Sequence, residues 1–86
     1  MKTIKIAPSI DEVNYDKETN ALITEFNGLK ISYRLLWDFS AEQVEQLKGA
    51  LCEGIALSSR PHQLINLMNN VYRGEGGEQI GELSIA

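Results

Sequence analysis

The sequence predicts an α+β fold in which a mostly antiparallel sheet of about three to five strands carries two α-helices on one face. Three observations support this. Apolar and polar residues alternate in the first part of the chain, apolar residues recur at helical spacing after Phe39, and alternation returns at the end. The predicted element order is β-β-β-β-α-α-β, a small two-layer sandwich.

Size and composition favour a single domain over residues 1–86. With 86 residues and 43% hydrophobic residues, the chain has material for one thin core. A homodimer would be a natural way to bury more surface. The net charge of −4 argues against nucleic acid as a partner. A single cysteine, no signal-peptide pattern and no membrane-spanning apolar stretch make the cytoplasm the expected location.

The first two predicted strands are short. Residues 2–6 alternate, with Ile4 and Ile6 on one face, and Pro8 is expected to end that strand because it lacks a backbone donor. Val13 and Tyr15 indicate a second strand, which the polar residues 16–20 connect to the next one.

The strongest local signal is Asn27-Gly28, the preferred composition for a two-residue type I′ hairpin turn. This turn sets a register in which Glu25 lies opposite Lys30 on the outer face. The pairs expected on the core face are Phe26 with Leu29, Thr24 with Ile31 and Leu22 with Tyr33, and Leu35 and Trp37 are expected to continue that face.

The first helix is predicted to begin after Ser40 and to run to about Leu57. Ser40 and Gln43 form a capping-box pattern, and Phe39 and Val44 are spaced for a hydrophobic staple. The apolar stripe of this helix consists of Val44, Leu47, Leu51 and Ile55. The small residues Gly49, Cys52 and Ala56 flank the stripe; close packing against the second helix is the favoured interpretation, and contact with a partner or a second copy is the alternative.

The second helix is predicted to begin near residues 58–61, because proline is tolerated in a first helical turn. Gly74 is expected to end it. Its apolar stripe consists of Leu64, Ile65, Met68, Val71 and Tyr72. Leu83 and Ile85 alternate with polar residues and predict a last strand that pairs with the sheet.

No motif in the sequence identifies an enzyme, a cofactor site or a metal site. Cys52 and His62 are the only residues of their types, and a thiolate–imidazole pair is a nucleophile design. Cys52 falls inside a predicted helix, away from the helix N-terminus that would lower its pKa. One cysteine and one histidine also leave a transition metal short of ligands. A small enzyme or ligand-binding domain that uses Cys52 and His62 is therefore kept as an alternative hypothesis and is not the favoured hypothesis.

The favoured hypothesis is a small acidic, non-enzymatic module that binds another protein, as an inhibitor or accessory subunit. The polar face of the second helix is rich in neutral amides, which bind a partner at low desolvation cost, although an ordinary solvated face has the same appearance. The candidate partner-binding residues are Gln63, Asn66, Asn70, Tyr72 and Arg73.

A second hypothesis is mimicry of nucleic acid against a basic partner. It rests on four carboxylates near the start of the chain, which a solvated surface also explains. These residues are Asp11, Glu12, Asp16 and Glu18.

Overall fold

The computed structural model describes residues 7–70 and 76–86 and confirms the α+β fold. The expected strand at residues 2–6 lies outside the described residues. In chain order, the elements are the 3-10 turn η1 (Ile10–Glu12), the strands β1 (Asn14–Asp16), β2 (Ala21–Phe26) and β3 (Leu29–Leu35), the helices α1 (Ala41–Leu57) and α2 (Pro61–Asn70), and the strand β4 (Gly81–Ile85).

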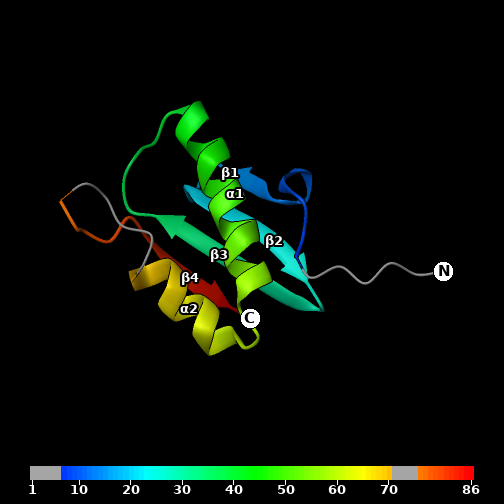
Figure 1. The fold of residues 1–86 in the computed structure, drawn as a ribbon. Helices are drawn as coiled ribbons and strands as arrows, with labels where there is room; N and C mark the ends of the chain where they lie inside the picture. The colour runs from blue at the N-terminus through cyan, green and yellow to red at the C-terminus, as the bar shows by residue number, and fades with distance from the viewer. Residues whose placement is uncertain (1–6, 71–75) are drawn as a thin grey trace.

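The strands form one antiparallel sheet in the order β1-β2-β3-β4. Figure 1 shows α1 crossing the face of the sheet and α2 lying beside β4. The last strand therefore pairs with the sheet, as its alternating pattern predicted. No helix in the described part of the chain has the length and apolar character needed to cross a membrane.

The β2–β3 hairpin has the predicted turn and register. Asn27 and Gly28 have φ values of 54° and 78°, the left-handed conformation that a type I′ turn requires at both central positions. The observed pairs include Phe26 with Leu29, Thr24 with Ile31, Leu22 with Tyr33 and Glu25 with Lys30.

Nearly all buried apolar side chains of the described residues belong to one cluster between the sheet and the helices. Tyr33, Leu22, Leu51 and Met68 are its largest fully buried members. The prediction for Trp37 was wrong. The strand β3 ends at Leu35, so Trp37 lies outside the sheet, remains 40% exposed and stacks on Phe39 with ring centroids 5.3 Å apart.

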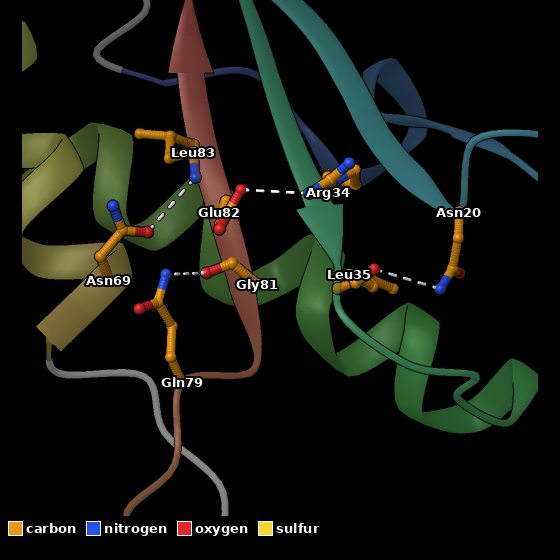
Figure 2. Close-up of polar contacts among 8 residues, drawn as sticks. All are labelled: Asn20, Arg34, Leu35, Asn69, Gln79, Gly81, Glu82 and Leu83. Atoms are coloured by element: carbon orange, nitrogen blue, oxygen red, sulfur yellow. Dashed lines mark hydrogen bonds and ion pairs between the residues drawn. The ribbon is translucent and has the colours of Figure 1, made fainter.

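Asn20 fixes the connection that follows β3. Its φ of 55° is unusual for a residue other than glycine, and three contacts support it. Its Nδ2 donates to the carbonyl oxygens of Leu35 (3.3 Å, Figure 2) and Trp37 (2.8 Å), and its Oδ1 accepts from the Tyr15 hydroxyl (2.5 Å). The chain between β3 and α1 is thereby tied back to the start of β2.

Both helices begin where the sequence predicted, α1 after its capping box and α2 at Pro61. The Ser40 hydroxyl accepts from the Gln43 amide at 3.2 Å, and the Gln43 Oε1 accepts from the Ser40 amide at 3.0 Å, which completes the capping box. Before α2, the backbone amide and the hydroxyl of Ser59 both donate to Gln63 Oε1. Gly74, together with Val71 and Tyr72 of the predicted second stripe, lies outside the described residues.

The small residue between the helices is Gly54, which the sequence analysis did not single out. A Cβ on Gly54 would lie 3.0 Å from Met68 Sδ and 3.3 Å from Leu64 Cδ1, so the missing side chain lets α1 and α2 approach closely. The expectation that Gly49 faces the second helix was wrong. A Cβ on Gly49 would instead meet Ile10 of η1 at 3.7 Å.

Candidate functional site

The best candidate site is a pocket where the turn of the β2–β3 hairpin meets the junction of the two helices. Its volume is about 300 Å³. We call it the hairpin-end pocket. Its apolar lining comes from the sheet and from both helices, and consists mainly of Phe26, Leu29, Ile31, Ile55, Leu64 and Ile85.

The hairpin-end pocket is open because the helix layer turns back before the sheet ends. Three residues, 58–60, connect α1 to α2. The turn of the hairpin, which connects the paired residues Phe26 and Leu29, reaches past the end of α1 (Figure 1). Phe26 is consequently only half-buried and Leu29 is 39% exposed. Apolar surface that the core would otherwise cover therefore faces solvent.

The polar residues of the pocket come from the turn and from the helix junction: Asn27, Ser58, Ser59 and Arg60. Arg60 has the one ionisable side chain among the described residues of the lining, and this side chain makes no ion pair or hydrogen bond with the described residues. In contrast, Arg34 forms an ion pair with Glu82 at 3.2 Å (Figure 2). The pocket therefore has a positive charge in a chain whose net charge is −4.

The outer edge of β4 adjoins this pocket. Lys30 and Ala86 exchange two backbone hydrogen bonds, and the Leu36 amide donates to the Ile80 carbonyl, so alternate residues of β4 face β3. The backbone groups of Gly81, Leu83 and Ile85 therefore point away from the sheet.

Two side-chain amides each bond one outward backbone group in the first part of that edge (Figure 2). Gln79 Nε2 donates to the Gly81 carbonyl at 2.7 Å, and Asn69 Oδ1 accepts from the Leu83 amide at 3.2 Å. The outward amide and carbonyl of Ile85 have no hydrogen bond within the described residues. Because Ile85 also lines the pocket, an open stretch of strand edge lies beside an open apolar surface.

The residues that we predicted as partner-binding lie elsewhere or were not placed. Gln63 is exposed, but its Oε1 accepts both bonds from Ser59. Asn66 is exposed on α2. Neither lines the hairpin-end pocket. The Asn70 side chain, Tyr72 and Arg73 lie outside the described residues, so their predicted role stays a prediction.

Two of the four carboxylates in the predicted acidic surface stabilise local structure. Glu12 Oε1 accepts from the Ser9 amide at 3.0 Å and caps η1, and Asp16 Oδ1 accepts from the Glu18 amide at 3.0 Å. Asp11 and Glu18 are exposed. These local hydrogen bonds explain the acidic residues at positions 12 and 16, so a basic partner is not needed to explain them.

Cys52 and His62 do not form a site with the hairpin-end pocket. Cys52 is half-buried against the core and His62 is exposed at the start of α2; neither lines the pocket, and no hydrogen bond joins them in the part of the chain that is described. Burial, and then the negative charge of Glu12, raise the pKa of the Cys52 thiol. The thiol form therefore predominates at neutral pH.

Metal-ligating side chains are dispersed over the described residues, which contain no group of three or more His, Cys, Asp or Glu suited to a metal ion. Every buried side-chain nitrogen and oxygen among the described residues that are not exposed has a hydrogen-bond partner. No polar atom of these residues is therefore left to indicate a missing ligand inside the core.

Sequence reasoning missed the hairpin-end pocket, although one signal pointed to it. The type I′ register places the apolar pair Phe26 and Leu29 directly at the turn. An apolar pair at a hairpin tip needs a cover, and its exposure could have been expected.

Comparisons with protein families, with curated proteins and with solved structures found no match to this chain. Function therefore has to be inferred from the geometry of the pocket and its surroundings.

Proposed function

We propose that this protein is a non-enzymatic interaction module that binds another protein by accepting an apolar side chain of that protein in the hairpin-end pocket. The observation that carries the proposal is the apolar lining shared by the hairpin, α1, α2 and β4, which remains open to solvent. The effect on the partner, as an inhibitor or accessory subunit, would follow from this binding.

The size of the pocket supports a side chain as its occupant. Pockets for small molecules span roughly 300 to 1,000 Å³. At about 300 Å³, the hairpin-end pocket is at the lower end of that range. It has room for one or two apolar side chains of a partner, whose remaining contacts would spread over the surrounding surface.

The chemistry of the lining supports binding over catalysis. General acid–base and nucleophilic catalysis require titratable groups within hydrogen-bond distance of each other. The lining, as far as the described residues form it, contains no side-chain carboxylate, imidazole or thiol. The hydroxyl of Ser59 donates to Gln63 Oε1 at 2.8 Å, so it is directed at an amide rather than at a base.

The substitution Ala56→Gln tests the proposal. Ala56 lines the pocket, is exposed, and lies in the last turn of α1, so a longer polar side chain there fills the pocket at little cost to the fold. Peptides selected from a phage-displayed random library against the wild-type protein should share a large apolar residue. They should bind A56Q at least about tenfold more weakly, which corresponds to about 1.4 kcal/mol, measured by fluorescence polarisation.

Ala41→Gln is the matched control, because Ala41 is the exposed first residue of α1 and does not line the pocket. A41Q should bind the selected peptides like the wild type. Equal binding to A56Q and to the wild type, or a selection that enriches no peptide, would contradict the proposed function.

A further inference from the structure

We infer that the hairpin-end pocket recognises an extended acidic peptide segment, in which a large apolar residue enters the pocket and a neighbouring carboxylate pairs with Arg60. This inference rests on the proposed function and specifies the chemistry of the partner. Three features of the pocket lead to it: its apolar lining, the charge of Arg60, which is the one charged side chain among its described residues, and the open edge of β4.

The positive charge of Arg60 favours a partner segment that carries a negative charge. Arg60 has no ion pair within the described residues, although the chain contains 12 acidic and 8 basic residues. An arginine guanidinium offers several donors in a planar array that matches a carboxylate. A carboxylate close to an apolar anchor would therefore be favoured over a neutral or basic side chain.

The edge of β4 selects a peptide over a small amphipathic acid. Gln79 donates to the Gly81 carbonyl and Asn69 accepts from the Leu83 amide, whereas both outward groups of Ile85, beside the pocket, lack a hydrogen bond within the described residues. An extended main chain supplies a donor and an acceptor to such an edge, which is how peptides add to sheets. A fatty acid supplies neither group along its chain.

Peptide variants test the carboxylate. The most enriched phage peptides are synthesised with each Asp or Glu retained, and again with that residue changed to Asn or Gln. The wild-type protein should bind the acidic form about fivefold more tightly than the amide form, the strength expected for a solvent-exposed charged contact. Arg60→Gln should abolish this preference by weakening the acidic form alone.

Arg34→Gln is the matched control, because Arg34 is also exposed but pairs with Glu82 outside the pocket. R34Q should keep the full preference for the acidic form. A preference that survives in R60Q, or is absent from the wild type, would overturn the inference. In either case, the loss of binding in A56Q would still support the proposed function, so the two failures are distinguishable.

Two further measurements test the nature of the occupant. N-methylation of a peptide residue next to the apolar anchor removes a main-chain donor and should weaken binding about fivefold at one position. Decanoate at millimolar concentration should not displace the peptides. If decanoate displaces the peptides from the wild type but not from R60Q, the inferred occupant would be a small amphipathic acid and not a peptide. If sedimentation shows a dimer of the wild type that A56Q disrupts, the inferred occupant would be a second copy of this chain.

Discussion

Gly81, the first residue of β4, shows how a single residue limits the packing of the sheet on the core. A Cβ at this position would lie 2.6 Å from Tyr33 Cζ and 2.8 Å from the Arg34 carbonyl oxygen. One of these atoms belongs to the backbone and the other to a fully buried ring, so neither can move without disturbing β3. The close approach of β4 to β3 therefore requires glycine.

We expect Gly81→Ala to lower the free energy of unfolding by about 2 to 3 kcal/mol, since overpacking strains the sheet. Gly49→Ala is the control. Its Cβ would make an ordinary 3.7 Å contact inside α1, and alanine is the better helix former, so stability should rise by about 0.5 to 1 kcal/mol. Urea unfolding followed by circular dichroism measures both. Similar effects of the two substitutions would contradict this account of Gly81.

At the scale of the element, β4 is an edge strand protected by side chains rather than by another strand. Exposed strand edges pair readily with other chains, and proteins cover them or shorten them. Here Asn69 of α2 accepts a hydrogen bond from the Leu83 amide, and Gln79 donates one to the Gly81 carbonyl. The opposite edge is β1, which has only three residues. Within the described residues, Gly81 and Leu83 each have one outward backbone group bonded in this way, whereas Ile85, near the end of β4, has neither.

Removal of the Asn69 side-chain amide tests whether it protects the edge of β4. Asn69→Ala leaves the part-buried Leu83 amide without an acceptor and should cost about 1 to 2 kcal/mol of unfolding free energy. Asn66→Ala, an exposed position on the same helix, should change stability by less than about 0.5 kcal/mol. Hydrogen exchange should also show faster exchange at the Leu83 amide in N69A alone. Unchanged protection there would argue against the bond.

At the scale of the whole molecule, Tyr33 connects the two layers. It is fully buried in the middle of the sheet, and its hydroxyl donates to the Met68 carbonyl in α2 at 3.5 Å. Burial raises the pKa of Tyr33 from 10.0 to about 12, because the phenolate would lose its hydration. Since the buried side chains form one cluster, ionisation of Tyr33 would affect both layers together.

The protein should therefore lose stability at alkaline pH. The contribution of Tyr33 is complete below pH 10, where the unfolded chain also keeps its phenol neutral. It is lost as the pH rises from 10 through about 12, because only the unfolded state ionises readily. The loss should approach about 2 kcal/mol.

Tyr33→Phe separates this effect from the titration of other groups. The variant cannot ionise at residue 33, and it should cost less than about 1 kcal/mol at pH 7, since the hydrogen bond to Met68 is long. Urea unfolding at several pH values between 8 and 12 should show the difference between wild type and Y33F shrinking and then reversing. A constant difference over that range would contradict the assignment to Tyr33.

Local chemistry was enough to predict the hairpin and both helix starts. Asn27-Gly28 permits one turn geometry and hence one register, and the Ser40–Gln43 capping box satisfies helix donors within four residues of chain. The sequence by itself therefore determined the strands of the described residues, the starts of both helices and the buried stripe of α1. It also indicated a chain without an evident catalytic motif, which the peptide-binding proposal builds on.

Only the tertiary structure decided where the layers stop covering each other. Four features depend on how far one element extends past another. They are the exposure of Trp37, the contact of Gly54 with α2, the hydrogen bond from β4 to Asn69 and the hairpin-end pocket. Such offsets arise from packing between segments distant in sequence, and residue periodicity reports only the local conformation of each segment. For that reason the candidate site lay at the junction of five elements and not on the helix face that the sequence favoured.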